Sequence, residues 1–88
     1  MTIYIIEKYE FWEGGEIIYV SDNYNRSLSL FKELKNSMAT GTGLHLRRYK
    51  LNVLKRSRIE NIYEDIWWVE KDYDGNWRII HELNEEVE

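Results

Sequence analysis

The apolar and polar residues at the start of the chain alternate with a period of two. Ile3 and Ile5 begin an odd-numbered apolar face in the segment Thr2–Trp12, and such alternation is typical of a half-buried strand. A second strand-like run covers Glu16–Val20. Because paired glycines tolerate the positive φ angles of tight turns, the pattern predicts a β-hairpin that turns at Gly14–Gly15.

The period then changes to that of a helix. Five apolar residues are spaced by four, three, three and four positions, which places them on one helix face: Tyr24, Leu28, Phe31, Leu34 and Met38. The preceding run Ser21–Asp22–Asn23 supplies side-chain oxygens for an N-cap. Two glycines in the run 39–43 favour the end of the helix there. We expect this helix to pack by its apolar face on a sheet.

A third strand is predicted over Leu44–Leu54, with a phase change inside it. Leu44 and Leu46 have one parity, whereas Tyr49 has the other. A β-bulge near Arg47–Arg48 would return these apolar side chains to one face. Alternatively, a short strand begins afresh at Tyr49.

Ser57 and Glu60 match the capping-box pattern, and the apolar residues that follow keep helical spacing. This pattern predicts a short helix over Arg58–Asp65, or an irregular crossing with one helical turn.

The last predicted element is a hairpin. The runs Ile66–Lys71 and Trp77–Leu83 flank an Asp-Gly pair in the segment 72–76, which is a strong turn signal. The element order ββα-β-(short α)-ββ predicts an α+β fold, with about five antiparallel strands and one main helix on one face of the sheet. We expect one domain over residues 1–83 and a frayed acidic tail over 84–88.

The composition narrows the class of protein. The chain has 88 residues and no cysteine, which excludes a disulfide framework and a thiolate metal site. No apolar run is long enough to cross a membrane. The amino terminus has no basic region followed by a small-residue cleavage site, so we expect no signal peptide and a cytoplasmic location.

The charged residues are strongly segregated. Six acidic and three basic residues lie in 1–33, seven basic and no acidic residues lie in 34–59, and ten acidic and two basic residues lie in 60–88. The formal net charge of −4 therefore hides a basic centre between two acidic arms.

Candidate catalytic chemistry is sparse. His45 and His81 both fall in predicted strands, outside any zinc-protease motif, so we expect structural roles for them. No nucleophile can be matched with a base, and the turn 72–76 lacks the twelve-residue calcium-loop pattern. We predict a protein without enzymatic activity, cofactor or metal site.

The basic segment has two interpretations. Its cationic groups and the neighbouring aromatic ring could neutralise phosphates and stack on a base: Arg47, Arg48, Tyr49, Lys50, Lys55, Arg56 and Arg58. Alternatively, the acidic arms neutralise the segment within the fold through cross-strand pairs.

Adjacent tryptophans in one strand must point to opposite faces of the sheet. If Trp67 or Trp68 remains outside the core, it forms an interaction anchor within an acidic surface. We predict a partner-binding surface made of six residues: Glu64, Trp67, Trp68, Glu70, Asp72 and Asp74.

In its size and its Tyr-, Asn-, Ile- and Glu-rich composition, the chain resembles small phage-encoded accessory proteins of the anti-CRISPR and anti-defence type. This resemblance implies a non-catalytic inhibitor that engages a host protein or nucleoprotein. The acidic carboxy-terminal third would imitate a nucleic-acid backbone in a basic cleft. A nucleic-acid-binding module and a small homodimeric regulatory protein are the alternatives.

Overall fold

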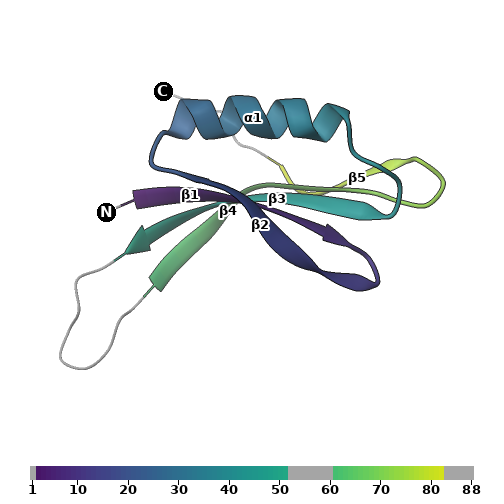
Figure 1. The fold of residues 1–88 in the computed structure, drawn as a ribbon, viewed down its shortest axis with the longest axis horizontal. Coiled ribbons are helices and arrows are strands. Elements are labelled where there is room, and N and C mark those ends of the chain that lie inside the picture. Colours follow the sequence, from purple (N-terminus) through teal and green to yellow (C-terminus); the bar gives the residue numbers. More distant parts are fainter. Residues whose placement is uncertain (1, 52–60, 83–88) are drawn as a thin grey trace.

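Five antiparallel strands and one helix form the part of the chain described by the structure, a computed structural model that covers residues 2–51 and 61–82 (Figure 1). The elements are β1 (Thr2–Glu10), β2 (Glu13–Ser21), α1 (Tyr24–Asn36), β3 (Thr42–Leu51), β4 (Asn61–Lys71) and β5 (Trp77–His81). The strands form one sheet in the order β2-β1-β3-β4-β5, and every neighbouring pair is antiparallel. The predicted α+β class, with a five-stranded sheet and a main helix, is confirmed.

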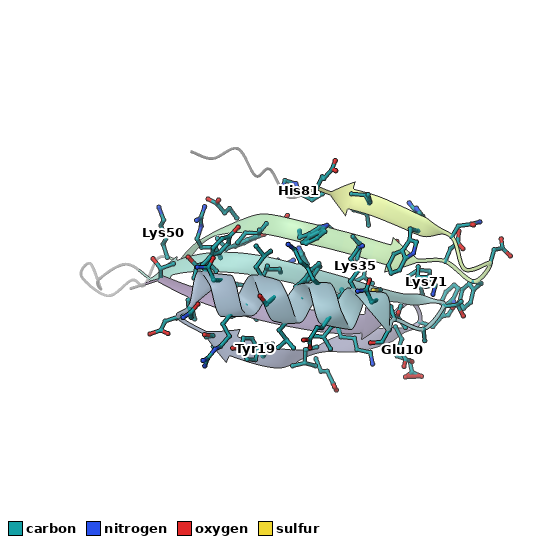
Figure 2. The ribbon with its side chains drawn as sticks, turned by 90° about the horizontal axis from the view of Figure 1, so that it is seen from above. Glu10, Tyr19, Lys35, Lys50, Lys71 and His81 are labelled. Atoms are coloured by element: carbon teal, nitrogen blue, oxygen red, sulfur yellow. The ribbon has the colours of Figure 1, made fainter. Side chains whose placement is uncertain are left out.

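Helix α1 lies along one face of the sheet, as the views from the side and from above agree (Figures 1 and 2). It begins at the predicted cap, where the side chain of Asn23 accepts a hydrogen bond of 2.9 Å from the backbone N–H of Arg26. Phe31 is fully buried, and the other four residues of the predicted apolar face pack around the core. The connection β2–α1–β3 crosses β1, which lies between β2 and β3.

The hydrophobic core lies between α1 and the three central strands. It contains Tyr4, Ile6, Phe31, Leu44, Leu46, Ile66 and Val69. Each fully buried aliphatic or aromatic side chain contributes about 1.5–3 kcal/mol, so this small set holds the two layers together. The core uses the helix-facing side of the sheet and leaves the other side of the sheet without a covering layer among the described elements.

The first hairpin does not turn at Gly14–Gly15, the position predicted from the sequence. The turn is Phe11–Trp12, and Gly14 and Gly15 lie inside β2. The register shifts between Tyr9 and Glu10, so β2 carries an extra residue at this point. A Cβ on Gly15 would lie 3.0 Å from atoms of Lys8 and Tyr9. The two glycines therefore accommodate a bulge and a close backbone approach instead of a turn.

The predicted second helix is wrong where the structure describes it. Residues 61–65 belong to β4, paired with β3, and residues 58–60 lie outside the described residues. The pairing of β4 with β3 stabilises a strand here, although the local spacing of apolar residues favours a helix.

The predicted bulge in β3 is also wrong, because the extra residue at the register shift is Ile66 on β4. Strand β3 keeps its alternation, so Tyr49 faces away from Leu44 and Leu46.

The carboxy-terminal hairpin follows the Asp-Gly prediction. Gly75 adopts a φ of 87°, and its N–H donates to the carbonyl of Asp72. Strand β5 ends at His81, earlier than predicted, and the tail 84–88 lies outside the described residues. Within the described ranges, no helix is long and apolar enough to cross a membrane.

Candidate functional site

Three loops converge at one end of the sheet. The N–H of Phe11, in the β1–β2 turn, donates to the carbonyl of Gly41 at 3.0 Å, and the N–H of Gly41 donates to the carbonyl of Lys71 at 2.6 Å. Gly41 belongs to the α1–β3 connection, and Lys71 ends β4. These two bonds hold the β1–β2 turn beside the β4–β5 turn, although the two turns lie about sixty residues apart in the sequence.

Aromatic packing reinforces this junction. The ring of Tyr73 covers Gly41 so closely that a Cβ there would overlap it, and Gly41 has a φ of 75°. The rings of Tyr73 and Phe11 meet edge to face, with 5.5 Å between their centroids. Glycine is required at position 41 both for its backbone conformation and for the space that Tyr73 occupies.

Trp12 projects from this end of the molecule. Its side chain is 85% exposed, which is the highest value among the large apolar residues that the structure describes. A shallow recess of about 280 Å³ lies beside it, lined by the β1–β2 turn, the 39–42 segment and Tyr73. Tryptophan is enriched among the residues that dominate interface energies, so Trp12 is a candidate interface anchor.

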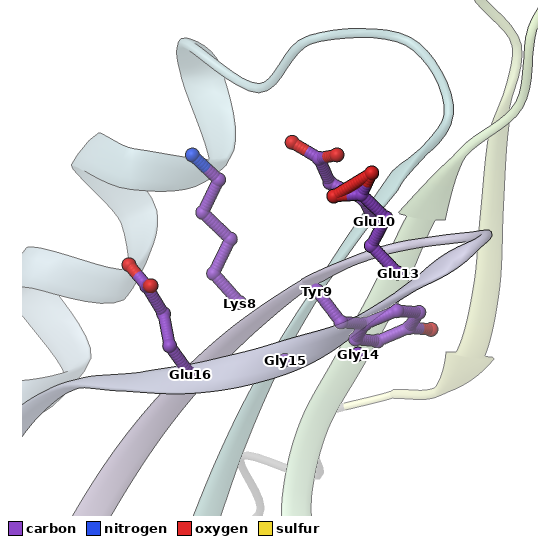
Figure 3. A pocket seen from close by; sticks show the side chains of 7 residues that line it. All are labelled: Lys8, Tyr9, Glu10, Glu13, Gly14, Gly15 and Glu16. Atoms are coloured by element: carbon purple, nitrogen blue, oxygen red, sulfur yellow. The ribbon is translucent and has the colours of Figure 1, made fainter.

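Acidic residues flank Trp12 and also lie in the neighbouring turn. Glu10 and Glu13 flank the turn and are both exposed, and Asp74 is exposed in the neighbouring turn. Figure 3 shows Glu10 and Glu13 on the same side of the hairpin as Lys8 and Glu16, with Tyr9 on the opposite side. We define the acidic-aromatic tip by its members: Glu10, Phe11, Trp12, Glu13, Tyr73 and Asp74.

A second cluster lies on the sheet face opposite α1, which we call the uncovered face. His45 Nε2 lies 2.8 Å from Asp65 Oδ1, and Arg47 Nε lies 3.2 Å from the same oxygen. Arg47 also pairs with Glu7 at 3.6 Å. The ring of Trp68 stacks on His45, with 4.4 Å between the centroids.

The burial and charge of this cluster decide its protonation. Desolvation, reinforced by the positive charge of Arg47, lowers the pKa of His45 below its usual value of 6.5. Burial alone would raise the pKa of Asp65, but its contacts with His45 and Arg47 lower it. At neutral pH the cluster therefore contains a neutral imidazole that donates to a carboxylate.

Tyr9 centres a third cluster on the same face. Its hydroxyl donates to Glu70 and accepts a hydrogen bond of 2.9 Å from Trp68 Nε1. Burial, followed by the interaction with Glu70, raises the pKa of Tyr9 to about 12. The ring lies over Gly43, where a Cβ would overlap it. These contacts join β1, β3 and β4 across the face.

The His45–Asp65 pair resembles two members of a catalytic triad, but its position indicates a structural role. In a triad the second imidazole nitrogen must reach a nucleophile beside the substrate. Here the imidazole is 4% exposed and lies under the Trp68 ring, so substrate access to it is blocked. Among the described residues no group of three or more acidic or histidine side chains is placed to hold a metal ion.

The six residues predicted to form an acidic and aromatic surface do not come together. Trp67 packs against Phe31 under the helix, with ring centroids 4.8 Å apart, and Glu64 pairs with Arg48. Trp68 and Glu70 lie on the uncovered face within the His45 and Tyr9 clusters. Asp72 organises its own turn by accepting hydrogen bonds from the N–H groups of residues 74 and 76, both at 2.9 Å. Asp74 alone lies at the tip.

The described side chains of the basic segment also point to both faces of the sheet. Arg47 pairs with Glu7 and Asp65 on the uncovered face, whereas Arg48 pairs with Glu64 across the strands on the helix side. Tyr49 packs against Tyr63, with 5.6 Å between the ring centroids, and Lys50 is exposed. For Arg47 and Arg48 the interpretation that the fold neutralises the segment is confirmed. Lys55, Arg56 and Arg58 lie outside the described residues.

The tip was not predicted from the sequence, because the hairpin turn was expected at Gly14–Gly15, three residues beyond its position in the structure. With that turn, Trp12 was expected to end a strand, although it lies between Glu10 and Glu13 in the sequence. A tryptophan between two acidic residues next to a Gly-Gly pair is the signal that was available. Comparison with protein-family models, curated proteins and solved structures found no match to this chain.

Proposed function

We propose that this chain is a non-catalytic binding protein that engages a basic protein surface through the acidic-aromatic tip. The exposure of Trp12 carries this proposal. Removing a large indole from water on binding is strongly favourable, and tryptophan is enriched among the few residues that dominate interface energies. The tip holds that side chain on a rigid base, because Gly41 ties the neighbouring segments together.

The charge of the tip favours a basic partner. Glu10, Glu13 and Asp74 place three carboxylates in the two turns that form the tip, in a chain whose formal net charge is already −4. Complementary charge accelerates the encounter and rejects acidic competitors. In this proposal, Trp12 supplies affinity and the carboxylates supply orientation and choice of partner.

Inhibition is the role that we propose for such binding. A rigid acidic tip fits a basic cleft that would otherwise hold a nucleic-acid backbone, and occupation of that cleft blocks it. The size and composition of the chain are similar to those of small phage-encoded inhibitors, which supports this proposal. The nucleic-acid-binding alternative has less support, because Arg47 and Arg48 point to opposite faces and are both engaged in ion pairs.

Affinity capture with matched variants tests the proposal. The immobilised chain is exposed to a lysate of cells in which it acts, beside Trp12→Ala and the double variant Glu10→Lys/Glu13→Lys. Ile79→Ala and Glu33→Lys serve as controls, because both residues are exposed and neither belongs to the tip.

We expect a partner that binds the unmodified chain and both controls, that elutes with salt, and that is lost from both tip variants. Circular dichroism must show that all variants are folded. Equal capture by the tip variants, or capture that is lost equally from the controls, would contradict the proposal.

A further inference from the structure

The uncovered face does not have the composition of a solvated sheet face. An antiparallel sheet with one face in water normally carries polar residues on that face. The register places Val20, Ile5 and Arg47 in one cross-strand row, and Ile3, Tyr49 and Tyr63 in the next. Half of this face is therefore apolar.

The apolar half is open to solvent. Ile17 is 56% exposed, Val20 is 54% exposed and Tyr63 is 55% exposed, and all three point away from α1. They lie on β2 and β4, with the half-buried Ile3 and Ile5 of β1 between them. A contiguous exposed apolar patch of this kind marks an interaction surface.

The charges on the same face are already satisfied within the chain. Arg47 is paired with Glu7 and Asp65, and Arg78 is paired with Glu70 at 3.4 Å. A face with two guanidinium groups and three carboxylates is close to neutral. It therefore offers little attraction to a strongly basic or acidic partner, but two copies of it can approach without strong repulsion.

The area of the face suits a stable dimer. Four strands have nine or more residues and are about 30 Å long, and β5 with five residues is about 17 Å long. At about 4.8 Å spacing between strands, the face covers roughly 650 Å² per copy, not far below the roughly 800 Å² that each partner buries in a standard specific interface. The two edges of the sheet offer less, because β5 has only five residues and β2 carries two register shifts and exposed glutamates.

From the apolar pattern, the internal charge pairing and the area, we infer that the uncovered face is the interface between two copies of this chain. The two sheets pack face to face about 10 Å apart, with Ile17, Val20 and Tyr63 of each copy against the apolar half of the other. A two-fold axis makes such a contact self-complementary. The acidic tips lie at the sheet ends, outside this contact, so the inference does not depend on the proposed function.

Sedimentation equilibrium of the full chain, from about 1 to 500 µM, tests the inference. The unmodified chain is compared with Ile17→Lys and Val20→Lys, which place a charge in the interface. The matched control is Ile79→Lys, since Ile79 is also 56% exposed but lies on the helix side of the sheet. Circular dichroism and thermal unfolding must show that each variant is folded. Trp12→Ala serves as a second control, at the tip.

We expect a monomer–dimer equilibrium for the unmodified chain and for both controls. Ile17→Lys and Val20→Lys should weaken dimerisation at least about tenfold. A monomer throughout this concentration range overturns the inference, as does a dimer that Ile79→Lys weakens as much as the face variants do. A monomeric chain that captures a different protein through Ile17 and Val20 also overturns it, because the uncovered face then belongs to that partner.

Discussion

The substitution Gly43→Ala tests the packing of the uncovered face. A methyl group at position 43 would overlap the ring of Tyr9, so the ring must move. Its hydroxyl then leaves both Glu70 and Trp68 Nε1. Gly43 lies inside β3 and has no positive φ, so the substitution adds volume without backbone strain.

The expected loss follows from the two hydrogen bonds. A bond to a charged group contributes about 1.5–3 kcal/mol, and a neutral one contributes about 0.5–1.5 kcal/mol. Two effects reduce this loss. Water reaches the half-buried face and replaces part of the lost hydrogen bonding, and alanine within a strand is about 0.5–1 kcal/mol more favourable than glycine. We therefore expect the free energy of unfolding to fall by about 2 kcal/mol. For a domain of this size that lowers the Tm by about 8–16 °C.

Urea unfolding followed by circular dichroism measures the change in a double-mutant cycle. In a Tyr9→Ala background the same Gly43→Ala substitution should cost less than about 0.5 kcal/mol, because the obstructing ring is gone. Gly14→Ala is the control, since no atom lies within 4 Å of its added Cβ. Equal costs of Gly43→Ala with and without Tyr9 would refute the described contact.

Three further predictions concern protonation and the core. The pKa of His45 is lowered from 6.5 in the folded chain, so the unfolded chain binds that proton more readily. The free energy of unfolding should therefore fall as pH drops below about 6.5, and His45→Gln should flatten this fall in pH-dependent urea titrations. Spectrophotometric titration should find one tyrosine that ionises only near pH 12, and Tyr9→Phe should remove that transition. Phe31→Ala should destabilise the chain by about 3–5 kcal/mol in the same urea assay, because the fully buried ring packs on Trp67, and a loss below about 1 kcal/mol would contradict the assigned core.

Helix α1 and the last hairpin were predictable because their signals are local. The four-three-three-four spacing of apolar residues, the cap at Asn23 and the Asp-Gly pair each act within a few residues of the chain. The opposite orientations of Trp67 and Trp68 also follow from strand geometry alone, and the structure places Trp67 under the helix and Trp68 on the uncovered face.

The errors arose where distant pairing outweighs local preference. Residues 61–65 have helical spacing but pair with β3, and the Gly-Gly pair accommodates a bulge opposite Tyr9 instead of a turn. Strand register depends on partners far away in the sequence, so a single-sequence pattern cannot fix it. The extra residue Ile66 illustrates this point, because its effect is seen only in the pairing of β4 with β3.

The candidate site was missed for the same reason. Segments near residues 12, 41 and 73 meet only after the sheet has formed, and the hydrogen bonds at Gly41 that join them are between backbone atoms. The prediction of an acidic, aromatic surface stays a prediction. We propose that this surface is the tip and not the face of β4, because Glu64, Trp67 and Glu70 have partners inside the fold.

Site-specific photocrosslinking from position 12 tests the central claim most directly. Benzoylphenylalanine is placed at Trp12 in one variant and at Ile79 in another, and each is irradiated in the lysate used for affinity capture. We predict one dominant protein adduct from position 12 only, mapped by mass spectrometry to a lysine- and arginine-rich surface and suppressed by high salt. The absence of an adduct from position 12, or the same adducts from position 79, would show that the tip is not the binding site.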